Sequence, residues 1–382
     1  MDATELQALR NLTARFVREN LMPLESVILK REATGKGRYL TEDEEKALNE
    51  KARHVGLWGI DVPEELGGLD LPVPAMIAVQ EELSKTIVYY NLPPDSPNLH
   101  MLMMSGSDVV KEKYLAPYAR AEVQSCMAVS EPDAGGDPAA MRTSAVKDGE
   151  DWVINGRKIW ITGAERADFA IVMASTDRSK GSKGISAFIV EKGTPGYRVV
   201  RQIPMIGGGF TYELEFENCR VPATYMLGSE GSGYGPMQHR LSVRRLQMGA
   251  WCLGFAQRAV EMMVEHVKMR KTFGVALADR QAIQWWIADA ETQIHAMRLM
   301  VYDAAERLER GERLRSELSM IKVFAAEAAW EIVDKAMQSF GGMGMSKELQ
   351  LQLFANRLRI LRVVEGPSEV HRMVIARNRL KA

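Results

Sequence analysis

Three long amphipathic segments toward the C-terminus constrain the fold of this chain more than any other feature. The apolar pattern predicts helices over 246–270, 282–310 and 318–340, and in the last of them one face stays apolar throughout. Helices of this length normally pack side by side as an antiparallel bundle, because none can bury its apolar face alone. We therefore predict a helical bundle over residues 233–382.

The rest of the chain divides into a helical part and a β part. Residues 1–122 show helical spacing interrupted by proline and glycine. Asn155-Gly156, within 152–160, predicts the tight turn of a hairpin. Further short strands are predicted at 169–174, 185–190, 197–203 and, with strict alternation of apolar and acidic residues, 212–217.

The expected fold class is therefore α+β, in three parts. We predict an N-terminal α-helical domain over 1–122, a small antiparallel β-barrel or sandwich over 123–232, and the C-terminal helical bundle over 233–382.

Charge, cysteines and histidines exclude several classes of function. The chain has 49 Lys and Arg against 50 Asp and Glu, so bulk charge points neither to nucleic acid nor to a membrane surface. Its cysteines form no CxxC pair and its histidines no HExxH motif, so we expect no disulfide framework and no metal site. We see no secretion signal and no apolar run of membrane-spanning length, and therefore expect a protein of the reducing cytoplasm.

The segment 363–372 contains the strongest candidate for a catalytic group. Glu365 stands between two valines and a Gly-Pro turn, just before a basic helix. A carboxylate among apolar neighbours is disfavoured as an anion, which makes it a better proton acceptor. In isolation, however, an acidic residue before a helix is more often a solvated cap.

Other segments each allow two interpretations. The glycine-rich segment 130–137 could bring backbone N–H groups close to a ligand, or be a polar surface loop. Trp160 and Thr162 could stack on and hydrogen-bond to an aromatic cofactor, or be a core tryptophan and an edge threonine. Arg270 could bind phosphate, or simply belong to a helix end before Gly274. The basic stretch 356–382 could bind nucleic acid, but a solvated helix face or a polyphosphate site is favoured.

Together these segments resemble the acyl-CoA dehydrogenase family nearly from end to end. The matching motifs are SEPDAGGD at 130–137, NGRKIWITGA at 155–164, FENCRVP at 216–222, RKTFG at 270–274, QSFGGMG at 338–344 and EGPSEVHRMVIAR at 365–377. The resemblance implies N-terminal helices, a central antiparallel β-barrel domain and a C-terminal four-helix bundle.

The resemblance also implies a reaction and its partners. It implies FAD-dependent α,β-dehydrogenation of an acyl-CoA thioester to the trans-2-enoyl-CoA, with electrons passed to an electron-transferring flavoprotein. Glu365 matches the catalytic base, and its backbone N–H would help to polarise the thioester carbonyl. Arg245 matches an arginine near the catalytic carboxylate. Some family members carry their base one residue earlier, where this chain has Arg244.

Further residues match cofactor-binding positions of the family. The flavin ring would be lined by Met127, Val129, Ser130, Gly136, Trp160 and Thr162. The FAD of a neighbouring subunit would be held by Arg270, Thr272, Phe273, Gln338 and Gly342, and Gln281 and Glu369 are also expected to contact cofactor. The resemblance thus implies a homodimer or homotetramer.

Two departures from the family pattern affect the expected substrate. The usual Glu-Gly-Thr reads Glu365-Gly366-Pro367, and Gly136 replaces a usual serine. The Glu-Gly-Pro-x-Glu-Val-His motif resembles a subgroup associated with longer, branched or hydroxylated acyl chains. Alternative functions on the same fold are a flavin-dependent oxidase or monooxygenase, against which Glu365 argues, and a non-catalytic DNA-associated flavoprotein, against which the near-neutral charge argues.

Overall fold

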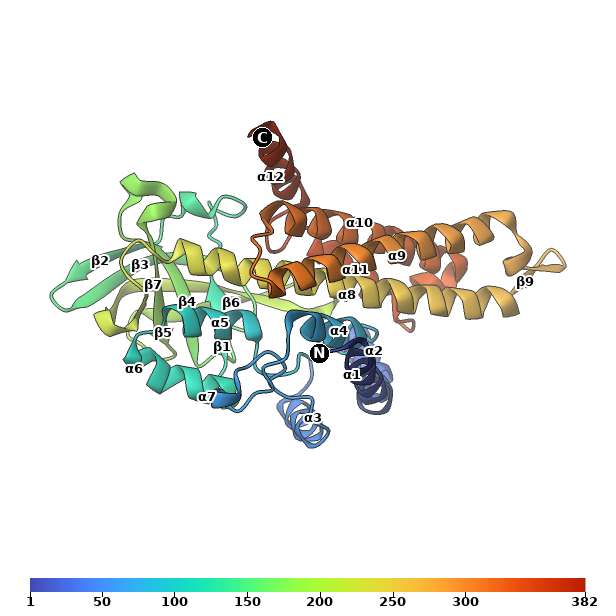
Figure 1. The fold of residues 1–382 in the computed structure, drawn as a ribbon, viewed down its shortest axis with the longest axis horizontal. Helices are drawn as coiled ribbons and strands as arrows, with labels where there is room; N and C mark the ends of the chain where they lie inside the picture. The colour runs from blue at the N-terminus through green and yellow to red at the C-terminus, as the bar shows by residue number, and fades with distance from the viewer. Residues whose placement is uncertain (382) are drawn as a thin grey trace.

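The computed structural model describes residues 1–381 and begins with short helices (Figure 1). Helices α1 and α3 each start with a capping box, in which Asp2 pairs with Glu5 and Thr41 with Glu44. The helices of this part are α1 (Ala3–Phe16), α2 (Glu25–Ala33), α3 (Glu42–His54), α4 (Val73–Leu83), α5 (Ser96–Ser105), α6 (Asp108–Val110) and α7 (Ala116–Ala119).

The long helices predicted from the C-terminal pattern are confirmed. They are α8 (Tyr234–Met269), α9 (Gln281–Glu309) and α10 (Arg315–Ser339), followed by α11 (Leu351–Leu361) and α12 (Ser368–Lys381). Helices α8, α9 and α10 run side by side, with α11 packed along them (Figure 1). Helix α8 starts well before residue 246, because residues 234–245 are mostly polar and give no apolar period there.

The middle of the chain forms one sheet in the order β6-β7-β3-β2-β4-β5-β8, with β1 paired to β4. Its neighbours pair antiparallel, except that β1 and β2 run parallel to β4. The predicted strands are confirmed, and that at 212–217 is longer than predicted. The strands are β1 (Ser125–Ala128), β2 (Ser144–Asp148), β3 (Asp151–Ile161), β4 (Phe169–Ser175), β5 (Ile185–Glu191), β6 (Tyr197–Pro204), β7 (Phe210–Pro222) and β8 (Met226–Leu227).

The hairpin turn predicted at Asn155-Gly156 is wrong. Both residues lie inside the continuous strand β3, where the pairing with β7 shifts register. Gly156 has φ +152°, and a Cβ there would lie 2.6 Å from the Cα of Thr143, so the glycine permits a bulge rather than a turn. The real turn joins β2 to β3 at Gly149, which has φ +64°.

Buried side chains join the three parts. Glu81 on α4 is fully buried and is bound by Arg10 of α1 at 2.6 Å and by Arg298 of α9 at 3.2 Å, which ties the N-terminal helices to the bundle. Strand β4 is buried on both faces. Phe169, Ile171 and Met173 pack with residues of α5 and α7, and the alternate side chains pack inside the sheet.

Two further properties concern the cysteines and the helices. The three cysteines, Cys126, Cys219 and Cys252, are all free and buried. Within residues 1–381, no helix combines the length and the hydropathy that a membrane crossing requires.

A buried ion pair fixes the segment after β1 against β3. Lys158 on β3 is fully buried, and its Nζ lies 2.8 Å from Oε1 of Glu131 and 3.0 Å from the carbonyl oxygen of Val129. Glu131 also accepts the backbone N–H groups of Arg142 and Thr143. Burial lowers the pKa of Lys158 to about 8 against the opposing effect of Glu131. The loop 129–143 is therefore positioned by one charged pair and its hydrogen bonds.

Replacing Lys158 by methionine should destabilise the protein by about 3–5 kcal/mol, because it leaves Glu131 buried without a counter-charge. The control is the neighbouring Arg157→Met, which removes exposed pairs with Glu213 and Glu215 and should cost at most about 1 kcal/mol. Denaturant unfolding of both variants measures the difference. Equal losses would show that the buried pair does not hold the loop.

Candidate active site

Glu365 lies in the turn between α11 and α12 in a strained backbone conformation. Its φ is +56°, and that of Gly366 is +94°. A Cβ at Gly366 would lie 3.0 Å from Nε2 of His371, so the following position needs glycine. A non-glycine residue at positive φ is costly and persists only where the surroundings hold it.

The carbonyl oxygen of Glu365 is held by two side chains from different helices. Arg245 Nε on α8 donates to it at 3.0 Å, and His371 Nε2 on α12 lies 3.1 Å from it. Burial, followed by the charge of Arg245, lowers the pKa of His371 to about 4, so the ring is neutral near pH 7. Nε2 therefore carries the proton and donates to Glu365, while Nδ1 accepts from the hydroxyl of Ser319 at 3.0 Å.

The side chain of Glu365 forms an ion pair with Arg240 on α8. Nη1 of Arg240 lies 3.3 Å from each carboxylate oxygen. Arg240 is only 8% exposed, and its Nε donates to Oδ1 of Asn98 at 2.8 Å. Asn98 in turn donates to Ser125, whose hydroxyl lies 3.2 Å from that of Tyr118. A chain of hydrogen bonds through α5 and β1 thus fixes the guanidinium.

The apolar surroundings expected for Glu365 are wrong, because its carboxylate faces an arginine. Arg240 was not among the residues predicted for the site, although Arg240, Arg244 and Arg245 lie four and five positions apart and therefore project from neighbouring faces of one helix. Arg244, at the alternative base position, bonds to Oδ1 of Asp95 and, at 2.9 Å, to Gln247. Arg245 lies near Glu365 as predicted, but contacts its backbone.

Three of the predicted ligand-binding segments meet at the turn that carries Glu365. They are 130–137, the end of β3 within 155–164, and 365–377. The backbone N–H of Ile159 on β3 donates to the carbonyl of Ser130 at 2.9 Å, which joins the segment 130–137 to the end of β3. At Gly136, a Cβ would lie 3.4 Å from Val370 and 3.6 Å from Pro367. The segment 130–137 therefore connects the end of β3 with the turn that carries Glu365.

The residues predicted to line a flavin ring lie on these segments. Met127, Val129 and Ser130 are half-buried along and after β1. Trp160 is 52% exposed, with φ +64°, and Thr162 is exposed just beyond the end of β3. Glu369 is exposed in the first turn of α12.

The remaining predicted cofactor residues gather at the far end of the bundle. Arg270 follows α8, and the β9–β10 hairpin (Lys271–Thr272 and Val275–Ala276) projects there with Phe273 99% exposed at its tip (Figure 1). The ring of Phe340, just after α10, stacks on His266 of α8 with centroids 4.1 Å apart. This contact brings the end of α10 beside the end of α8. The other predicted residues at this end, also exposed, are Gln281, Gln338 and Gly342.

Comparisons with known proteins agree with this architecture. Profiles of the N-terminal, middle and C-terminal domains of acyl-CoA dehydrogenase match residues 3–122, 126–219 and 231–380. The (R)-benzylsuccinyl-CoA dehydrogenase of Thauera aromatica is 40% identical, over 98% of this chain and 95% of that protein. The solved butyryl-CoA dehydrogenase of Megasphaera elsdenii is 31% identical with a TM-score of 0.87 over 98% of both chains. PigA, solved with FAD and proline, is 26% identical with a TM-score of 0.88 over 99% of both chains.

The chain belongs to the acyl-CoA dehydrogenase family. It is an oxidoreductase of that family, whose members bind FAD. The residues present here fit such a cofactor in two respects. Trp160 is 52% exposed at the end of β3, where its ring can stack on a planar group. Gly136 brings backbone without a side chain against the turn that carries Glu365, where even a Cβ would touch Val370.

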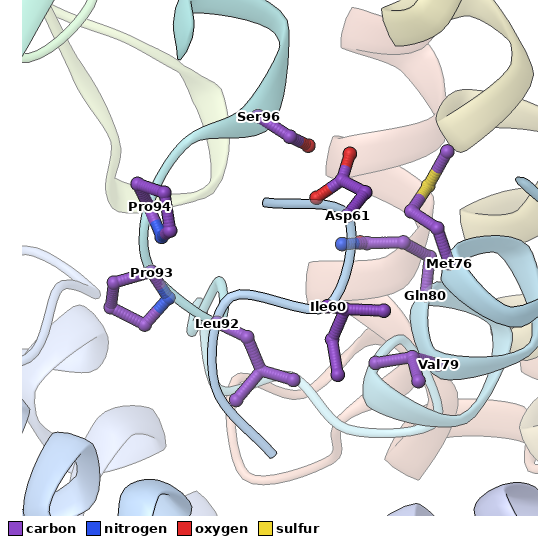
Figure 2. A pocket seen from close by; sticks show the side chains of 9 residues that line it. All are labelled: Ile60, Asp61, Met76, Val79, Gln80, Leu92, Pro93, Pro94 and Ser96. Atoms are coloured by element: carbon purple, nitrogen blue, oxygen red, sulfur yellow. The ribbon is translucent and has the colours of Figure 1, made fainter. Parts of the chain in front are cut away.

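A small cavity of this dehydrogenase lies between α4 and the segments 60–61 and 92–96 (Figure 2). The carboxylate of Asp61 points across it toward Ser96, which accepts a hydrogen bond from Gln247 at 3.1 Å (Figure 2). Burial raises the pKa of Asp61, although His100 and Ser96 act in the opposite direction. The cavity is lined by Ile60, Asp61, Met76, Val79, Gln80, Leu92, Pro93, Pro94 and Ser96.

Because the pKa of His371 is about 4 when folded and roughly 6.5 when unfolded, acid should destabilise the enzyme through this residue. Between pH 6.5 and 4 the unfolded chain binds a proton that the folded chain does not, so the free energy of unfolding falls as the pH falls. Between pH 7 and pH 5, the free energy of unfolding of His371→Gln should fall by about 2 kcal/mol less than that of the wild type. Denaturant unfolding at both pH values measures this.

The control for this pH experiment is His54→Gln, because His54 is exposed on α3. It should lose as much stability on acidification as the wild type. If His371→Gln behaves in the same way, His371 is not a neutral buried histidine.

Proposed function

We propose that the enzyme removes the α-proton of an acyl-CoA thioester with Glu365 and dehydrogenates its α,β-bond. The observation that supports this proposal is the conformation of Glu365, whose strained backbone is held by Arg245 and His371 beside the segments expected to bind flavin. Strain that the surroundings maintain is typical of functional sites. A carboxylate is also the usual type of group for taking a proton from carbon next to a carbonyl.

The residues around Glu365 can also stabilise the developing enolate. The backbone N–H of Glu365 donates to no acceptor within residues 1–381, so it is free to bind the thioester oxygen. A donor fixed before the reaction stabilises the negative charge that forms on that oxygen. Bound FAD supplies the acceptor for the hydride that leaves the β-carbon. The product is the trans-2-enoyl-CoA, and we propose that the electrons pass on to an electron-transferring flavoprotein.

Glu365→Gln should keep bound FAD but slow its anaerobic reduction by acyl-CoA by about 10²- to 10⁴-fold, because the amide cannot take the proton. The measurement is the loss of the flavin absorbance in single turnover. The matched control is Glu331→Gln, which changes an exposed carboxylate paired with Lys335 on α10. A Glu365→Gln enzyme that still reduces FAD at the wild-type rate has its base elsewhere.

We also propose that a second copy of the chain completes each FAD site. The predicted residues at the far end of the bundle are remote from Glu365 in the same chain (Figure 1). They include an arginine suited to phosphate and a fully exposed phenylalanine, whose exposure to water is unfavourable. A homodimer or homotetramer would cover Phe273 and bring Arg270 to the FAD of another subunit.

Phe273→Asp should therefore shift the enzyme to a smaller particle and lower its ratio of FAD to protein. Light scattering with size-exclusion chromatography, combined with the visible spectrum, measures both. Val146→Asp is the control, because Val146 is equally apolar and 63% exposed, but on β2. A wild-type enzyme that is monomeric and saturated with FAD would contradict the shared site.

The turn that carries Glu365 also bears on the acyl group. Glu365-Gly366-Pro367 resembles the motif of the subgroup associated with longer, branched or hydroxylated acyl chains, and a substrate of that kind stays a prediction. Anaerobic titration of the flavin with straight and branched acyl-CoAs tests it, and a preference for butyryl-CoA would count against it.

A further inference from the structure

We infer that the substrate carries a second, free carboxylate two or three bonds from the carbon that loses its proton, and that Arg240 binds this carboxylate. The substrate class is thus the mono-CoA thioester of a short dicarboxylic acid. This inference rests on the proposed function and narrows it.

Cations outnumber anions around Glu365. Helix α8 presents Arg240, Arg244 and Arg245 to this region, where the acidic partners are Asp95 and Glu365. Arg245 contacts only the carbonyl of Glu365, which is not charged. Of two further carboxyl groups, Glu369 acts on Lys322, which is itself a buried cation, and Asp61 has a pKa that burial raises against the effect of His100. A further anion would balance the site.

A fourth arginine strengthens the excess of positive charge. Arg357 lies over the rings of Tyr89 and Trp251, at 4.4 Å and 5.4 Å from their centroids. Arg244 lies over the same Trp251 ring at 5.5 Å. Burial lowers the pKa of Arg357 to about 10, and the groups that act on it most strongly besides burial are Tyr89 and Arg38. Arg357 therefore adds a further buried cation beyond Arg244.

The catalytic step would move negative charge away from Arg240. When Glu365 takes the α-proton it becomes neutral, and Arg240 then loses the one carboxylate that it contacts within residues 1–381. Arg240 is 8% exposed, and a buried cation without a partner costs several kcal/mol. A substrate carboxylate on Arg240 would remain charged throughout the reaction and remove that cost.

The geometry of Arg240 suits a carboxylate ligand. Asn98 fixes its Nε, and the Nη1 side of the planar guanidinium is directed at Glu365. A fixed planar fork is the preferred receptor for a carboxylate. The hydrogen bonds of Asn98 to Ser125, and of Ser125 to Tyr118, hold this fork in place before a substrate arrives.

The distances limit where the second carboxylate can stand. In proton transfer the α-carbon lies about 3 Å from an oxygen of Glu365, and that oxygen lies 3.3 Å from Arg240. The α-carbon is therefore at most about 6 Å from Nη1, and an arginine–carboxylate bond accounts for about 2.8 Å of this. The remaining distance is covered by two or three bonds, which corresponds to succinyl or glutaryl thioesters.

The test is anaerobic FAD reduction in the holoenzyme by matched pairs of thioesters. Succinyl-CoA is compared with butyryl-CoA, and glutaryl-CoA with pentanoyl-CoA, so each pair differs only in a terminal carboxylate or methyl. We expect kcat/KM to be at least about 10-fold higher for the carboxylate member of one pair. Equal or better use of both methyl members overturns the inference but leaves the proposed function intact. Failure of all four to reduce a flavin that a longer or branched acyl-CoA does reduce overturns the inference alone, and failure of every thioester overturns both.

Variants of Arg240 separate recognition from a structural role. In Arg240→Gln the preference for the carboxylate member should fall at least about 10-fold, mainly through KM. In Arg240→Lys it should fall less, because the charge remains but the planar fork does not. Arg220→Gln, an exposed arginine on β7, should keep the wild-type preference. A loss of kcat that is equal for both members of a pair would assign Arg240 a structural role and overturn the inference. If Arg240→Gln does not fold, the inference is tested by the wild-type preference for the carboxylate member and by its decrease in Arg240→Lys.

Discussion

The burial of helix α8 is the constraint on which both the core and the site depend. Its 36 residues pack against α4, α9 and α10 in the bundle and against α5 near its start. Since an α-helix is a rigid rod that advances 1.5 Å per residue, burial of the stretch from Leu246 to Val267 fixes the direction of every side chain before it. Arg240 and Arg245 therefore reach Glu365 because the bundle core holds the helix that carries them, and the apolar packing and the charged site form one unit.

The environment of Glu365 is polar and fixed, although its neighbours in the sequence are apolar. Arg240 contacts its carboxylate, while Arg245 and the neutral ring of His371 hold its carbonyl. A buried ion pair adds little net stability, because desolvation offsets most of the attraction. The pair is therefore better explained by what it positions than by what it stabilises. The three contacts come from α8 and α12, so the position of the base depends on how these two helices pack.

The sequence predicted the helices and strands well where one face is apolar. It predicted them poorly where polar residues of the site, or a bulge, interrupt the apolar pattern. Helices α9 and α10 and strands β4 to β6 have clear periods, and their bounds were nearly correct. The start of α8 was missed because its arginines serve the site. Asn155-Gly156 was misread because a bulge uses the same backbone freedom as a turn. Glu365 was found from its motif, but Arg240 belongs to none. Its role depends on a contact across 125 positions of the sequence, which no local pattern contains.

The two positions that depart from the family pattern contact each other in the structure. Proline replaces a threonine at Pro367 and glycine replaces a serine at Gly136, and a Cβ on Gly136 would lie 3.6 Å from the ring of Pro367. A serine at 136 would bring its hydroxyl to a proline ring and to Val370, neither of which offers it a side-chain partner. Conversely, with proline at 367 there is no N–H or hydroxyl for a residue at 136 to bind. The contact between the two positions is therefore apolar in this chain, and neither residue brings a polar side-chain group to it that would need a partner.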